Sequence, residues 1–147
     1  MSSTALFRTE AEIARRRFAR SGPISVAVSF GTISLRLTGA LPSLEAQWEE
    51  LQASAPCSSA QTYDWAKACV RHILAPAGLD AVIVLGCAED GRPLFLWPFE
   101  LASAGGIKVL HWLGQDQANY NMGLFALETA PKFTAGDISR LLAEVAR

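Results

Sequence analysis

The side chains best suited to binding a ligand lie in one polar segment, residues 115–121. It holds two glutamines, an aspartate, two asparagines and a tyrosine between apolar stretches. Loops that present polar and aromatic groups on a rigid sheet are common ligand-binding positions. We therefore take Gln117, Asn119, Tyr120 and Asn121 as candidates for binding a substrate. The alternative interpretation is a turn whose Asn and Asp side chains satisfy its own backbone.

A second candidate is an anion-binding turn at residues 36–41, RLTGAL. Arg36 and Gly39 would belong to a loop that holds a pyrophosphate at a helix N-terminus, where backbone N–H groups point at the anion. Leu41 occupies a position where such a loop has a small residue, and Pro42 has no N–H to donate. An ordinary strand-to-helix turn is therefore the favoured interpretation.

The two histidines and three cysteines form no pattern that is known to support catalysis. Cys69 and His72 are three residues apart, but with Cys57 and His111 they match no standard zinc spacing. No G-x-S-x-G elbow, Walker loop or dinucleotide-binding motif occurs. The sequence predicts no metal site and identifies no catalytic residue.

Composition predicts a folded chain of domain size. The 147 residues are 50% apolar and 18% charged, with a net charge of −1, which argues against disorder and against a dedicated nucleic-acid binder. No apolar run reaches 18 residues, so no membrane span is expected. Three cysteines, an odd number, favour reduced thiols in the core of a cytoplasmic protein. The arginines at 15–17 and 20 precede an apolar stretch that is too polar for a typical signal peptide.

The elements that would position these candidates follow from the periodicity of apolar residues. Residues 1–22 are expected to form a basic helix or arm, and residues 23–147 one α+β domain with a largely antiparallel sheet and helices packed on it. Strands are predicted at 24–29, 32–38, 81–87, 93–101, 107–113 and 122–127, and helices at 43–55, 62–75 and 134–147.

Several residues predict how these elements begin and end. Ser43 and Thr62 are expected as N-caps, and Thr134 with Asp137 as a capping box. Pro98 requires a local edge or a bulge in its strand. The last helix is expected to bury Ile138, Leu141, Leu142 and Val145. Because no stop signal follows, the chain is expected to be the first portion of a longer protein.

Several segments together resemble a known family over residues 42–147. They are the helix with Trp48, the Thr62–Trp65 helix start, and the stretches GRPLFLWPF, GIKVLHWLG and ANYNMGLF. The chain resembles the N-terminal half of cellulose-biosynthesis-type (CelD/BcsL-like) acetyltransferases. These belong to the GNAT superfamily and are related to FemAB-type aminoacyltransferases. Asn119 stands where that family often has aspartate.

The resemblance implies an incomplete or degenerate GNAT-like half of an acyl-CoA-dependent N-acetyltransferase, with a role in polysaccharide or cell-envelope biosynthesis. It implies a sugar or amine acceptor near Asn119 and Tyr120. The chain would work with a second GNAT-like half or with a homodimer partner. Acetyl-CoA or another acyl-CoA would bind to that partner, and the isolated chain would be inactive. Two alternatives are a small stand-alone acetyltransferase that uses Arg36–Ala40, and a non-enzymatic interaction or dimerisation module.

Overall fold

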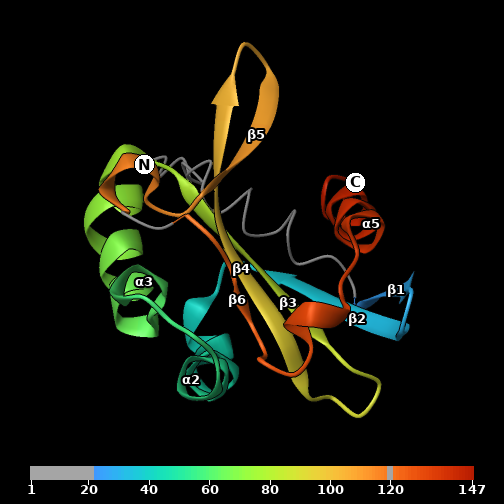
Figure 1. Ribbon diagram of the computed structural model, residues 1–147. Coiled ribbons are helices and arrows are strands. Elements are labelled where there is room, and N and C mark those ends of the chain that lie inside the picture. The colour runs from blue at the N-terminus through green and yellow to red at the C-terminus, as the bar shows by residue number, and fades with distance from the viewer. Residues whose placement is uncertain (1–21, 119–120) are drawn as a thin grey trace, which may run out of the picture.

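A curled antiparallel sheet, covered by helices on both faces, organises the chain (Figure 1). This computed structural model describes residues 22–118 and 121–147, so the predicted arm lies outside the described residues except for Gly22. The architecture is mixed α+β, as the sequence predicts. The elements are β1 (Ile24–Val28), β2 (Gly31–Thr38), η1 (Leu41–Leu44), α2 (Glu45–Ser54), η2 (Ser59–Gln61), α3 (Tyr63–Cys69), η3 (Val70–Leu74), α4 (Ala75–Ala77), β3 (Asp80–Cys87), β4 (Pro93–Ala104), β5 (Ile107–Trp112), η4 (Gln115–Gln117), β6 (Leu124–Phe125), η5 (Ala130–Lys132) and α5 (Ala135–Val145).

The strands follow one another across the sheet in the order β1-β2-β3-β4-β5, and β6 also pairs with β4. Every pairing is antiparallel. Hairpins join β1 to β2, β3 to β4 and β4 to β5, whereas the helical segment joins β2 to β3 and the chain through β5 and η4 joins β4 to β6. The β3 strand and the first eight residues of β4 are almost entirely buried. Their continuous apolar sequence fits a strand that is covered on both faces.

Each face of the sheet has its own apolar core. On one face, Trp48 and Leu51 of α2 and residues of α3 pack against Ile83 and Leu96. On the other face, Leu141 and Val145 of α5 pack with aromatic residues of β4. Figure 1 shows α2 and α3 on the opposite side of the sheet from α5. Alternate residues of β3 and β4 therefore pack against helices on opposite faces of the sheet.

Pro98 lies where β4 changes partners on the side that faces away from β3. The β4 strand pairs with β6 at Phe95 and Leu96 and with β5 from Phe99 to Ala104. On this side the carbonyl of Pro98 accepts a hydrogen bond from the N–H of Leu113. The proline nitrogen points to the same side, so β3 loses no hydrogen bond. This arrangement agrees with the prediction of a local edge at the proline.

Some predicted helix details are correct. Thr62 caps α3 by accepting a hydrogen bond from the N–H of Trp65, and Thr134 and Asp137 form the predicted capping box of α5. The helical stretch that starts at Tyr63 ends at Gly78, which has the left-handed φ of +67°.

Other details are wrong, each for a local reason. Ser43 is not an N-cap, because its hydroxyl donates to the carbonyl of Ala40 within η1. Leu142 is 43% exposed and Ile138 is partly buried, because Leu141 and Val145 are the apolar residues that α5 buries fully. The last strand, β6, is shorter than the predicted 122–127. The carbonyls of Met122 and Gly123 before it accept hydrogen bonds from the side chain of Gln61. Of the free cysteines, Cys57 is exposed rather than in the core.

No described helix has the length and apolar character needed to cross a lipid bilayer.

Candidate ligand-binding loop

The predicted binding segment joins β5 to β6, which pair with different parts of β4. We call residues 113–123 the polar loop. It begins where the N–H of Leu113 donates to the carbonyl of Pro98 at 3.0 Å. The chain then leaves the sheet through η4 and returns to pair Leu124 with Leu96. Both ends of the polar loop are thus tied to β4.

Glu100 fastens the start of the polar loop. This residue of β4 is only 3% exposed. One carboxylate oxygen accepts a hydrogen bond from the N–H of Gly114 at 3.0 Å, and the other accepts one from the side-chain amide of Gln115. A buried carboxylate is costly unless such bonds satisfy it. Glu100 therefore holds the first turn of the loop in one position.

Close packing fixes the same turn from the other side. Gly114 has a φ of +82°, and a Cβ placed there would lie 2.4 Å from Cη2 of Trp65 and 3.3 Å from Sγ of Cys69. Only glycine fits this conformation and this space without displacing α3. The next residue, Gln115, also has a positive φ, +39°.

Gln61 fastens the end of the polar loop. Its side chain is buried, and its Nε2 donates to the carbonyls of Gly123 at 3.1 Å and Met122 at 3.4 Å. Its Oε1 accepts from the N–H of Ser58 at 2.8 Å, and its own carbonyl accepts from Nε1 of Trp48 at 2.9 Å. The end of the loop is therefore joined to the helix layer through one satisfied side chain.

Gln117 and Asn121 of the predicted site are exposed, whereas Asn119 and Tyr120 lie outside the described residues. An exposed amide side chain offers both a donor and an acceptor, which suits the hydroxyl and amine groups of a polar neutral ligand. The loop is thus anchored at both ends by buried polar side chains and presents amides to solvent between them.

Arg36 and Gly39 lie elsewhere on the sheet. Arg36 is an exposed residue of β2 opposite Leu85, and a Cβ on Gly39 would lie 3.0 Å from the carbonyl oxygen of Ala81. The strands β3 and β4 lie between β2 and β5, so the two candidate sites are not brought together. The helix after this turn has only four residues, with Pro42 in its first turn. It presents few N–H groups to an anion.

The titratable groups near the loop include no activated nucleophile among those described. Burial, and secondarily the negative charge of Glu100, raises the pKa of the Cys69 thiol to about 11. Such a thiol stays protonated near neutral pH and reacts slowly. His111 lies directly opposite Glu100 on β5, and His72 is exposed on η3. The described residues contain no cluster of three or more side chains able to hold a metal ion.

A groove of about 920 Å³ lies on the face of the sheet covered by α5. Apolar residues such as Leu35, Val82 and Leu101 line it, together with Lys108 and Arg147. None of the described site candidates from the sequence lines this groove, so it is separate from the polar loop.

The sequence did not identify Glu100 and Gln61 as functional residues. A signal for Glu100 exists, because it is an acidic residue inside the otherwise apolar stretch 93–101. Such a residue needs a partner when the strand is buried. Gln61 has no comparable signal, since its partners Met122 and Gly123 are some sixty residues away.

Comparison with known proteins gives no match to any protein-family profile, curated protein or solved structure. The candidate site therefore stands on its own geometry.

Proposed function

We propose that this chain forms the N-terminal, acceptor-binding part of a GNAT-like, acyl-CoA-dependent N-acyltransferase. In this reaction the acceptor amine attacks the thioester carbon, loses a proton to a base and displaces the CoA thiolate. The element order of hairpin, helices and antiparallel meander supports the proposal. The single observation that carries it is the polar loop, anchored at both ends by Glu100 and Gln61.

The anchors argue for a binding role because a simple turn does not need them. Burying a carboxylate and an amide costs free energy that the hydrogen bonds to the loop offset. Their effect is to fix the backbone at Gly114, before Gln117, and at Met122 and Gly123, after Asn121. Preorganised donors and acceptors bind polar ligands such as sugars or amines with less loss of conformational entropy.

The acyl-CoA site is assigned to a second GNAT-like half or to a homodimer partner. The Arg36–Ala40 turn leads into a four-residue helix with a proline in its first turn, which is a poor cradle for pyrophosphate. We further propose a cytoplasmic protein of polysaccharide or cell-envelope biosynthesis. The three free thiols suit that compartment.

The test is an NMR titration of the uniformly ¹⁵N-labelled chain with glucosamine and, separately, with acetyl-CoA. Glucosamine is expected to shift amide signals of the polar loop, and acetyl-CoA is expected to shift none. Gln117→Ala is expected to weaken the glucosamine response by about tenfold, the cost of one hydrogen bond to the ligand. Gln47→Ala, a half-buried amide on α2 outside the loop, serves as the matched control.

The other outcomes separate the alternatives. Saturable acetyl-CoA binding would favour a stand-alone acetyltransferase, and Arg36→Ala would then have to weaken that binding. No response of the loop to glucosamine would overturn the acceptor-binding role for amino sugars.

A non-enzymatic interaction module is the second candidate function. It is favoured by Ile107, which is 68% exposed on the β4–β5 hairpin, and by Val109, which is 36% exposed. A monomeric chain that binds no hydrophobic dye would count against this candidate.

A further inference from the structure

The β5 strand forms one edge of the sheet, on a hairpin that projects from the body of the molecule (Figure 1). Within residues 22–118 and 121–147, no strand pairs with its outer side. An edge strand presents unpaired N–H and C=O groups, which can add a strand from another chain.

The pairing with β4 determines which backbone groups of β5 face outward. The N–H of Leu113 donates to the carbonyl of Pro98, so these two residues form a hydrogen-bonded pair. Such pairs recur at every second position of an antiparallel ladder. Ile107, Val109 and His111 therefore direct their backbone groups toward β4. The backbone groups of the alternate residues Lys108, Leu110 and Trp112 point away from the sheet.

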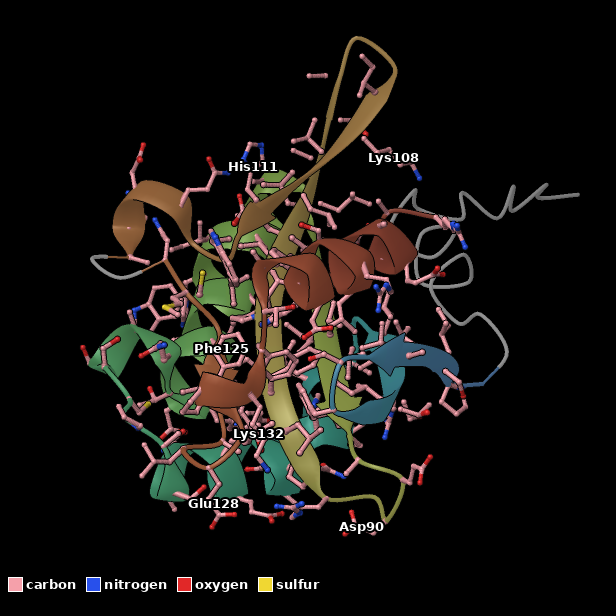
Figure 2. The ribbon with its side chains drawn as sticks, turned by 45° about the vertical axis from the view of Figure 1, so that its right-hand side comes forward. Asp90, Lys108, His111, Phe125, Glu128 and Lys132 are labelled. Carbon is pink, nitrogen blue, oxygen red and sulfur yellow. The ribbon has the colours of Figure 1, made fainter. Side chains whose placement is uncertain are left out.

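The side chains of β5 do little to protect this edge. Ile107 and Val109 share one face of the strand and are 68% and 36% exposed. The strand contains no proline, and its pairing with β4 runs in an unbroken register. Lys108 is its one residue among the Lys, Arg, Asp and Glu types. Figure 2 shows Lys108 and His111 projecting to opposite sides of the hairpin. Protected edges usually carry several charges, a bulge or a proline.

We propose that β5 pairs antiparallel with β5 of a second copy of this chain, with Val109 opposite Val109 on the two-fold axis. In this register Lys108 lies opposite Leu110, and these pairs exchange both of their backbone hydrogen bonds. Ile107 lies opposite His111, so each of the residues 107–111 has a partner within β5 of the other copy. One sheet then runs through both copies.

Charge and coverage select this register among the symmetric ones. Centring the pairing on Lys108 would place two lysines directly opposite each other, which is destabilising. Centring it on Leu110 or further along leaves Ile107, the most exposed apolar residue of the strand, without a partner inside β5. The pairing centred on Val109 avoids both costs and covers the exposed apolar side chains. In this register β5 is complementary to itself, because no like charges face each other and its exposed apolar residues are covered. Self-complementarity about one residue is what a two-fold interface between identical chains requires, so we assign the partner as a second copy.

This interface does not depend on the proposed acyltransferase role, because it uses none of the polar-loop residues. The test is sedimentation velocity of the whole chain over a concentration series. The wild-type chain is expected to show a reversible monomer–dimer equilibrium. Val109→Lys and Val109→Glu should each weaken it by about 100-fold, because like charges then face each other on the axis. An equimolar mixture of the two variants should restore a dimer that contains one of each, detected by native mass spectrometry.

Ser25→Lys is the matched control, since it adds the same charge to β1, the opposite edge strand, and should leave the dimer intact. Circular dichroism confirms that each variant is folded. A monomeric wild type would overturn the proposal, as would a dimer unaffected by Val109→Lys. If each variant is monomeric and their mixture is too, the Val109 register is wrong.

Discussion

Asp137 of α5 bonds to Ser29, 108 residues earlier in the chain, through both the backbone and the side chain of the serine. One carboxylate oxygen accepts from the N–H of Ser29 at 2.8 Å, and the other accepts from its hydroxyl at 2.6 Å. The second oxygen also accepts from the N–H of Thr134 at 3.0 Å. One carboxylate therefore caps α5 and joins it to the β1–β2 turn.

This linkage predicts a loss of stability in acid. The hydrogen bonds from Ser29, and then those from Thr134, hold the pKa of Asp137 well below its ordinary value. The unfolded chain then binds a proton at a pH where the folded chain does not, so stability falls as the pH drops below about 4. Asp137→Asn should lower the free energy of unfolding at pH 7 and remove this part of the pH dependence, as measured by urea unfolding at several pH values.

Thr134→Ala is the companion variant, since it removes the cap hydroxyl but keeps the carboxylate. It should cost about 1 kcal/mol, the usual effect of a lost N-cap, and most of the acid sensitivity should remain. Equal pH dependence in the wild type and in Asp137→Asn would contradict the assignment to Asp137.

Gly114→Ala should destabilise the chain by about 2 kcal/mol, because the added methyl group meets Trp65 and the backbone is left-handed. Gly105→Ala is the matched control. Gly105 also has a positive φ, +57°, but a Cβ there would have open space around it. It should lose only the conformational part, about 1 kcal/mol. Equal losses of unfolding free energy in the two variants would show that Trp65 does not confine the loop.

Local sequence signals predicted much of the fold. Alternating apolar residues identified β1 and β2, and the Thr134–Asp137 spacing identified the start of α5. These features depend on neighbours within a few residues, so spacing alone reveals them. Pro98 indicated a local edge or a bulge, because a proline lacks the N–H that a fully paired strand needs. In the structure it lies where β4 changes partners from β6 to β5.

The polar loop shows where such reasoning stops. Its composition pointed to residues 115–121, but its anchors are distant in sequence: Glu100 is 14 residues from Gly114, and Gln61 is 62 residues from Gly123. Ser43 failed as a cap for a related reason, because its hydroxyl has two local partners to choose from and donates backward to Ala40. Spacing cannot decide between competing hydrogen bonds.

Gln61→Leu tests the second anchor. The change leaves the N–H of Ser58 and the carbonyls of Met122 and Gly123 without this partner, and should cost about 2 kcal/mol. Amide hydrogen exchange near residues 121–125 should accelerate, since the loop end loses its tie. Gln52→Leu removes one hydrogen bond, which Gln52 Oε1 accepts from the N–H of Tyr63. It should cost about 1 kcal/mol without affecting exchange near residues 121–125. Unchanged exchange in Gln61→Leu would contradict the anchoring role.

The reactivity of the Cys69 thiol reports whether the polar loop stays packed against α3. Its Sγ lies beside Gly114, and its thiol pKa is raised to about 11. At pH 8 its thiolate fraction should be about 100-fold below that of an ordinary thiol. Because the thiolate is the reactive form, labelling should slow accordingly. In a Cys57→Ser/Cys87→Ser variant, Ellman's reagent should therefore label Cys69 slowly, and rapidly only in denaturant. Adding Gly114→Ala should speed the labelling by opening this contact. Rapid labelling of the folded double variant would mean that Cys69 is not held beneath the loop.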